Sequence, residues 1–215
     1  MTIAAKICGL STEAAVTAAV AGGAAYVGFV FYPPSPRAVT ADKAARLGAA
    51  VPPGITRVGM FVDADDHVID AILAEAPIDL LQLHGHESPD RVVDIKRRFA
   101  RPVMKAVAIA AAEDVVGAAR YEAVADLLLF DAKPPSRPGA LPGGNGFAFD
   151  WELIAGRSWR CAWMLSGGLT AEILPEAVRI SGAKAVDVSS GVESRPGEKD
   201  LDKIRAFLAA AHAAG

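Results

Sequence analysis

The sequence predicts an α/β protein of the (β/α)8 TIM-barrel class, with residues 1–215 forming one domain. Eight short runs of β-forming residues alternate with Ala-rich amphipathic stretches, at roughly 27 residues per unit (215 residues divided by eight), and this count matches the barrel. The strand runs are almost entirely apolar, as expected for parallel strands buried on both faces. An open doubly wound sheet is the structural alternative, but it usually has about five or six strands and would leave two units unexplained.

The predicted strands are apolar runs, each followed by a polar or Gly-containing segment. In chain order they are Ala4–Cys8, Tyr26–Phe31, Thr56–Val62, Leu80–Leu83, Val103–Val107, Leu127–Phe130, Ala162–Leu165 and Ala185–Val188. Between and after them, helical patterns include Thr12–Ala21, Asp42–Ala50, Pro89–Phe99, Ala171–Ser181 and a last helix, Asp200–Ala213. The long irregular segment Lys133–Phe147 holds four prolines and four glycines, and such a loop in a compact domain is often functional.

Composition excludes several classes of function. The net charge of −3, with no basic block, argues against a nucleic-acid partner. No apolar run approaches the ~20 residues of a membrane helix, and no signal peptide is recognisable at the N-terminus. Cys8 and Cys161 lie far apart in the sequence, which fits a reducing compartment and predicts no disulfide. We therefore expect a cytoplasmic protein with no membrane partner.

Two strand ends are suited to binding phosphate. Ser166–Gly168 follows the seventh strand and Ser189–Gly191 follows the eighth, and these loops form the usual phosphate site of the barrel. Small residues let backbone amides approach an anion closely, although glycines also end strands and cap helices. The run Gly143–Gly146 could complete the site. The predicted phosphate-binding residues are Gly144, Asn145, Gly146, Gly167, Gly168, Ser190 and Gly191.

Cys8 is a candidate base at the end of the first strand. Strand alternation places Lys6 and Cys8 on the same face, and a neighbouring ammonium favours a thiolate. A free cysteine is more often a small buried hydrophobic residue, an interpretation that suits Cys161 better. The spacing alone leaves both interpretations of Cys8 open.

Asp131 follows four apolar residues of the sixth strand, which makes it a candidate general acid or base at the active face. It could equally be a solvated loop carboxylate or a partner of Lys133. Arg37 follows the proline-stiffened segment Pro33–Pro36 and could bind a carboxylate, or lie on the surface. Gln82 and His84 share a face of the fourth strand, where a structural histidine is the commoner case.

Lys6, Gln82, His84 and Asp187 are further possible substrate contacts, because each belongs to a strand end. The acidic cluster at residues 63–66 fits a helix N-terminus better than a cation site. No spacing of histidine, cysteine or carboxylate residues suggests a metal, so no metal or other cofactor is expected.

Taken together, these strand ends resemble the phosphoribosylanthranilate isomerase family over nearly the whole chain, from Lys6 to Lys199. Each motif alone is only suggestive, but seven in the family's order are specific. The matching segments are Lys6–Leu10, Gly28–Pro33 with Ser35–Arg37, Val58–Val62, Leu81–Gly85, Gly143–Gly146 leading to Phe149–Trp151, Leu165–Leu169, and Val186–Glu193.

The resemblance implies a cofactor-free Amadori rearrangement in tryptophan biosynthesis, with Cys8 as general base, Asp131 as general acid and Arg37 binding the anthranilate carboxylate. The glycine turns around Gly144, Gly168 and Gly191 would bind phosphate, and the partner would be a small phosphosugar–anthranilate substrate. Small departures are Asn145, where the family often has threonine or serine, and Asp63, where asparagine is common. The loop from Ala132 to Pro142 is also somewhat long.

Other functions compete with this expectation. A ribulose-phosphate epimerase would gather histidines and aspartates around a metal, and those are lacking at the strand ends here. The histidine-pathway isomerase has aspartate at the end of the first strand, where this chain has Cys8. A non-catalytic phosphosugar-binding protein would tend to have lost Cys8 or Asp131 first. The Ala-rich helices reveal no dimerisation face, and the sequence does not distinguish between a monomer and a homodimer.

Overall fold

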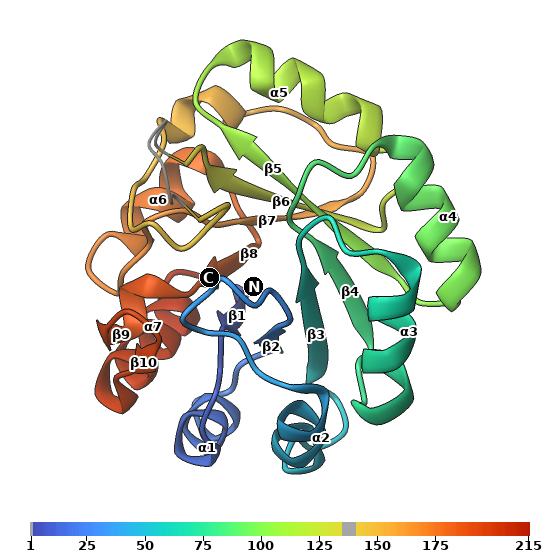
Figure 1. Cartoon of the computed structure of the whole chain (residues 1–215). Coiled ribbons are helices and arrows are strands. Elements are labelled where there is room, and N and C mark those ends of the chain that lie inside the picture. The colour runs from blue at the N-terminus through green and yellow to red at the C-terminus, as the bar shows by residue number, and fades with distance from the viewer. Residues whose placement is uncertain (1, 135–140) are drawn as a thin grey trace.

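The computed structural model describes residues 2–134 and 141–215, and Figure 1 shows their arrangement as a barrel surrounded by helices. Eight parallel strands close the barrel in sequence order, and β1 pairs with β8 in the register Lys6 to Asp187. The predicted fold class is therefore confirmed. The strands are β1 (Ala4–Cys8), β2 (Tyr26–Val30), β3 (Thr56–Phe61), β4 (Leu80–Leu83), β5 (Val103–Ile109), β6 (Leu127–Ala132), β7 (Ala162–Leu165) and β8 (Ala185–Val188).

Helices surround the barrel, and most of them begin at an N-cap residue whose side chain accepts a hydrogen bond from a backbone N–H of the first turn. They are α1 (Glu13–Ala21), α2 (Ala41–Ala49), α3 (Asp66–Glu75), α4 (Pro89–Phe99), α5 (Ala112–Ala118), α6 (Leu174–Ser181) and α7 (Leu201–Ala213). Asp65 caps α3 by accepting a hydrogen bond from the Val68 backbone N–H at 2.9 Å, so the acidic cluster does lie at a helix N-terminus. Among the described residues, no helix is long and apolar enough to cross a membrane.

The expectation that an α-helix follows every strand is wrong for β6. The described part of the connection to β7 contains only the 3-10 turn η2 (Trp151–Ile154). Aromatic residues pack there instead: the Phe130 ring of β6 lies 4.7 Å from that of Trp159 and 5.6 Å from that of Trp163, between ring centroids. Residues 135–140 of the long loop lie outside the described residues, so the prediction for that loop is tested only at its two ends.

Several predicted boundaries shift by a few residues. β5 and β6 extend two residues further than predicted because they stay paired to their ends, with Ala108 opposite Asp131 and Ile109 opposite Ala132. β2 and β3 each end one residue earlier, and α6 begins at Leu174, three residues later than predicted.

Side-chain alternation along the strands divides the core in two. Most apolar residues pack between the strands and the helices, whereas a smaller cluster fills the barrel interior and includes Val58, Met104, Leu129 and Met164. Leu129 and Asp131 share a face of β6, so Asp131 lies directly above this inner cluster at the carboxyl end of the barrel. The polar residues of the site therefore lie directly above an apolar layer in the barrel interior.

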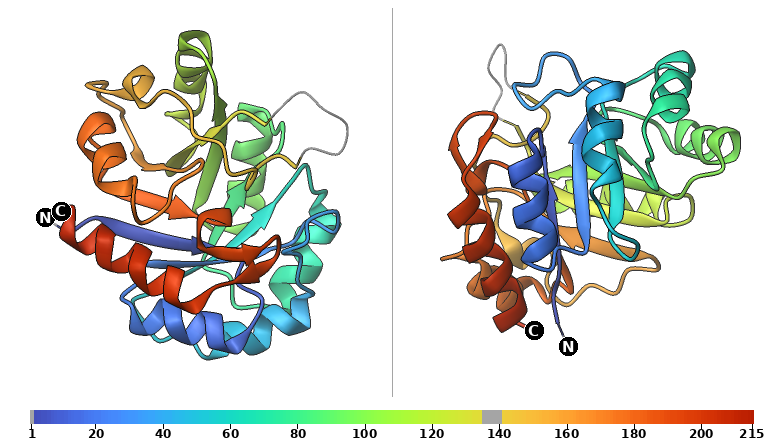
Figure 2. Two further views of the ribbon diagram at one scale, coloured as in Figure 1. Left: turned by 90° about the vertical axis from the view of Figure 1, so that its left-hand side faces the viewer. Right: turned by 90° about the horizontal axis from the view of Figure 1, so that it is seen from below.

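The last part of the chain adds a small ribbon before α7. After β8 come the 3-10 turn η3 (Ser190–Val192) and a two-stranded antiparallel ribbon of β9 (Glu193–Arg195) and β10 (Glu198–Lys199). Helix α7 then packs beside α1 and β1, and the start of β1 lies close to the end of α7 (Figure 2). The ribbon brings Glu193 and Lys199 to the site described next.

Candidate active site

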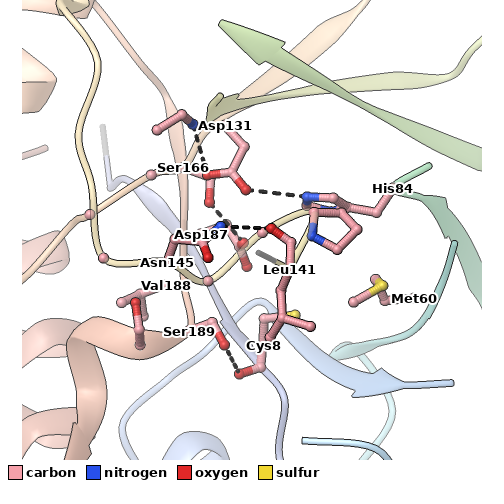
Figure 3. Close-up of a pocket in the computed structure, with 18 of the residues that line it drawn as sticks. Cys8, Met60, His84, Asp131, Leu141, Asn145, Ser166, Asp187, Val188 and Ser189 are labelled. Carbon is pink, nitrogen blue, oxygen red and sulfur yellow. Dashed lines mark hydrogen bonds and ion pairs between the residues drawn. The ribbon is translucent and has the colours of Figure 1, made fainter. Parts of the chain in front are cut away.

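A pocket opens at the carboxyl ends of the strands and contains about 760 Å³ of space, including its open mouth. Residues from β1, β4, β6 and β8 and from the intervening loops line it (Figure 3). All but one of the predicted site residues line this pocket: Cys8, Arg37, Gln82, His84, Asp131, Gly144, Asn145, Gly146, Gly167, Gly168, Asp187, Ser190 and Gly191. Lys6 is the exception, because it is fully buried behind them.

Cys8 lies on the pocket wall beside a buried ion pair. The Lys6 ammonium contacts the Asp187 carboxylate at 2.9 Å, and the Ser166 hydroxyl donates to the other Asp187 oxygen at 3.1 Å. Burial alone would lower the pKa of Lys6, but the charge and hydrogen bond of Asp187, helped by Cys8, hold that pKa above its usual value. Lys6 therefore stays charged and provides the cationic neighbour that strand alternation predicted for Cys8.

Asp131 emerges from the end of β6 and faces His84. Asp131 Oδ2 lies 3.2 Å from His84 Nε2, and Asp131 Oδ1 accepts a hydrogen bond from the Ala132 backbone N–H at 2.9 Å (Figure 3). Lys133, the alternative partner, instead contacts Asp114 at 3.3 Å. Asp131 is therefore neither a solvated loop residue nor the partner of Lys133, and it lines the pocket.

Arg37 is held from behind by residues whose roles the sequence did not reveal. Its Nε and Nη2 donate to the two Glu193 carboxylate oxygens at 2.7 and 2.8 Å, and Lys199 Nζ contacts Glu193 Oε1 at 2.8 Å. Nη2 also donates to the Gly144 carbonyl at 3.3 Å. In the part of the chain that the structure describes, these bonds use Nε and Nη2, and Nη1 makes no hydrogen bond. Glu193 ends the Val186–Glu193 motif, and nothing in its spacing indicates that it pairs with Arg37.

This cluster around Arg37 is buried and electrostatically balanced. Burial would raise the pKa of the Glu193 carboxyl, but hydrogen bonds and charge from Arg37 and Lys199 outweigh it and hold the pKa below its usual value. Lys199 Nζ also donates to the Ser189 carbonyl at 2.8 Å, and the Ser189 hydroxyl donates to the Cys8 carbonyl at 3.2 Å. One network thus joins Arg37, the loop after β8 and the end of β1.

Neighbouring loops pack so closely against Gly168 and Gly191 that neither position has room for a side chain. Gly168 has φ +63°, and a Cβ there would lie 2.6 Å from the backbone of residues 147 and 148, in the loop before β7. A Cβ at Gly191 would collide with the Leu169 carbonyl. The three predicted glycine clusters therefore meet at one end of the pocket. Asn145 lines that end but donates its side-chain amide to the Leu141 carbonyl at 2.8 Å (Figure 3).

The arrangement combines two possible proton-transfer groups, Cys8 and Asp131, on strands that are not neighbours in the barrel. Arg37 supplies a cation at one place and the glycine turns supply a concave backbone surface at another. Among the described residues, no group of three or more histidine, cysteine or carboxylate side chains could hold a metal. Such a site can bind a doubly anionic molecule and move a proton between two of its atoms.

Comparison with known proteins gives a consistent result. The model of the N-(5'phosphoribosyl)anthranilate (PRA) isomerase family matches residues 5–210. The N-(5'-phosphoribosyl)anthranilate isomerase of Paramagnetospirillum magneticum is 56% identical over 98% of both chains, and that of Paracoccus denitrificans is 55% identical over 99% of both.

Solved structures of proteins with this name are also similar. The enzyme of Thermotoga maritima superposes with a TM-score of 0.88 at 36% identity, covering 98% of this chain and 99% of its own. A crystal structure of phosphoribosyl anthranilate isomerase in complex with reduced 1-(o-carboxyphenylamino)-1-deoxyribulose 5-phosphate has a TM-score of 0.85 at 34% identity, with the same coverage.

Proposed function

The chain belongs to the N-(5'-phosphoribosyl)anthranilate (PRA) isomerase family, and we infer from this membership that it isomerises N-(5'-phosphoribosyl)anthranilate in tryptophan biosynthesis. The reaction is an Amadori rearrangement, in which an aminoaldose becomes 1-(2-carboxyphenylamino)-1-deoxyribulose 5-phosphate. The observation that supports it most directly is the presence of Cys8 and Asp131 on the wall of one pocket, with Arg37 and the glycine turns around them.

We propose that Asp131 is the general acid and Cys8 the general base. Asp131 gives its proton to the furanose ring oxygen, the bond from that oxygen to C1 breaks, and the nitrogen lone pair forms a Schiff base. The Cys8 thiolate then removes the proton on C2, and the electrons of that C–H bond form the enolamine. Tautomerisation to the ketone completes a reaction that is balanced without an external oxidant or reductant. Each positioned group contributes about 10²- to 10⁴-fold.

Two groups of residues would bind the two ends of the substrate and place its sugar between Cys8 and Asp131. The phosphate would bind the backbone N–H groups of the turns after β7 and β8, completed by Gly144–Gly146. The anthranilate carboxylate would bind Arg37, whose Nη1 donors face away from Glu193. Holding both ends leaves the sugar carbons between acid and base, and such positioning can account for much of the remaining rate.

We further propose that the protein acts in the cytoplasm, without a cofactor, as a monomer or homodimer. Cys8 and Cys161 are both free thiols, which agrees with a reducing compartment. The comparison proteins include monomers derived from the dimeric enzyme of Thermotoga maritima, so both states occur among proteins of this fold.

The decisive assay follows the loss of anthranilate fluorescence when freshly made phosphoribosylanthranilate is added, with the next synthase present to remove product. We expect rapid turnover by the parent protein and losses of about 10²-fold or more in Cys8→Ala and Asp131→Ala. Cys161→Ala is the matched control, because this second cysteine does not line the pocket. A fully active Cys8→Ala would remove the proposed base, and an inactive but folded parent would overturn the function.

A further inference from the structure

The side-chain amide of Gln82 is buried in the barrel interior with only one of its two polar atoms bonded. Gln82 is 1% exposed and lies on β4, opposite Met60 of β3 and Met104 of β5 in the strand register. Its Nε2 lies 2.8 Å from His84 Nδ1, whereas Oε1 has no hydrogen-bond partner among the described residues. An apolar side chain would avoid the desolvation of this amide, so packing alone does not account for a glutamine here.

The chemistry of the amide fixes the direction of the hydrogen bonds around His84. The structure turns the Nε2 end of the Gln82 amide toward His84 Nδ1. An amide nitrogen can only donate, so in this orientation His84 Nδ1 accepts, and the hydrogen of the neutral ring is then on Nε2. His84 Nε2 lies 3.2 Å from Asp131 Oδ2 and therefore donates to that carboxylate (Figure 3). The hydrogen bonds therefore run in one direction: Gln82 donates to His84, and His84 donates to Asp131.

We propose that Gln82 is a positioning residue for proton transfer, which holds His84 in its Nε2–H tautomer so that His84 stabilises the negative charge that forms on Asp131. The inference rests on the proposed role of Asp131 as general acid. As Asp131 releases its proton, a hydrogen bond already aimed at its carboxylate stabilises the product of that transfer. With the other tautomer, a lone pair on Nε2 would face the new charge and repel it.

Close packing keeps these hydrogen-bonded side chains in place and largely out of water. The side chains of His84 and Asp131 are 9% and 8% exposed, so solvent has little influence on the tautomer. Gly143 lies against both groups: a Cβ there would be 2.6 Å from His84 Nε2 and 2.8 Å from Asp131 Oδ2. With the ring enclosed in this way, its two partners decide which nitrogen carries the hydrogen, and Gln82 is the partner of Nδ1.

The first test is the variant Gln82→Met, which keeps an unbranched side chain of similar length and removes the donor to His84. We expect kcat to fall about 10- to 100-fold, by analogy with the loss when the residue that orients a metal-binding histidine is removed, with KM little changed. Met104→Leu is the matched control for packing, because Met104 is the register neighbour of Gln82 in the same interior layer and does not line the pocket. Full activity of Gln82→Met would overturn the proposal.

The second test measures the tautomer directly. In ¹⁵N-histidine NMR of the whole protein, His84→Gln identifies the resonances of His84 among the four histidines. The parent should show a protonated Nε2 and an unprotonated Nδ1, and Gln82→Met should show a mixture of both tautomers. A parent in which Nδ1 carries the hydrogen would overturn the proposal, whatever the kinetics.

A third experiment tests the role of Gln82 separately from the proposed role of Asp131 as general acid. If Gln82 acts through Asp131, then Gln82→Met should cause no further loss of kcat in an Asp131→Asn background. The same 10- to 100-fold loss in that background would show that Gln82 acts by another route. An Asp131→Asn variant with full activity would refute the acid itself, while the NMR result would still report the tautomer that Gln82 sets.

Discussion

Replacing Glu193 by glutamine should destabilise the protein strongly, because one carboxylate balances two buried cations. Arg37 and Lys199 both contact it, and the three side chains are 6%, 2% and 5% exposed in the order Arg37, Lys199, Glu193. Glutamine keeps the shape of the side chain and removes only the charge. The variant therefore leaves a guanidinium and an ammonium together without their counter-ion.

The magnitude follows from this burial. Breaking a buried ion pair by removing one partner costs about 3–5 kcal/mol. Burial also lowers the pKa of Lys199, an effect that Glu193 opposes, so the variant can relieve part of the cost by releasing the Lys199 proton. We therefore expect a loss of about 3 kcal/mol, which for a chain of this size corresponds to a decrease in Tm of about 6–12 °C.

The effect should depend on pH in a defined direction. The pKa of Glu193 is lower in the folded protein than in the unfolded chain, so its contribution is complete above the unfolded pKa and disappears as pH falls through the folded pKa. Below that point the parent also carries a neutral side chain at 193. The stability difference between parent and variant should therefore shrink on acidification.

Urea unfolding at neutral and acidic pH, followed by circular dichroism, measures both quantities. Arg205→Gln is the control, since its ion pair with Asp202 is exposed and its loss should change stability by less than about 1 kcal/mol. If the free energy of unfolding of Glu193→Gln lay within about 1 kcal/mol of the parent's at neutral pH, the reasoning would be refuted, because an exposed ion pair contributes that much. A difference that stays constant as the pH falls would refute it as well.

Three further predictions concern the pocket and the ion pair buried behind it. Arg37→Ala should mainly raise KM in the fluorescence assay, and a loss confined to kcat would contradict its role as an anchor. Gly143→Ala should lower kcat by about 10²-fold, because its new Cβ would displace His84; Gly117→Ala, with nothing within 4 Å of its Cβ, should keep full activity. Lys6→Met should lower the free energy of unfolding by about 3–5 kcal/mol, by leaving a buried carboxylate unpaired, and a urea midpoint equal to the parent's would exclude this.

The sequence predicts the fold well because the barrel strands are buried on both faces and appear as apolar runs. The apolar pattern is weaker where a strand carries a polar site residue. The sequence predicts that β6 ends at Phe130, yet the strand continues through Asp131 because β5 still pairs with it. Alternation correctly placed Lys6 beside Cys8, since these residues are two apart on one strand.

Contacts between distant segments could not be predicted in this way. Glu193 and Lys199 reach Arg37 through a ribbon after β8, and no local pattern encodes a pairing across 156 residues. The donor direction from Gln82 to Asp131 also required the structure, because spacing shows only that Gln82 and His84 share a face. The described part of the connection after β6 holds no α-helix, and its packing of Trp159 and Trp163 against Phe130 depends on tertiary contacts rather than on periodicity.

The aromatic packing that replaces that helix gives the protein a built-in optical probe. Trp151, Trp159 and Trp163 are the only tryptophans in the chain, and all three lie between β6 and the end of β7. Tryptophan fluorescence, excited selectively, therefore reports on a single sector of the barrel, the one whose strand carries Asp131, while circular dichroism averages over all the helices. If the emission changes at a lower urea concentration than the ellipticity, this sector opens first, and the opening is seen without attaching any dye.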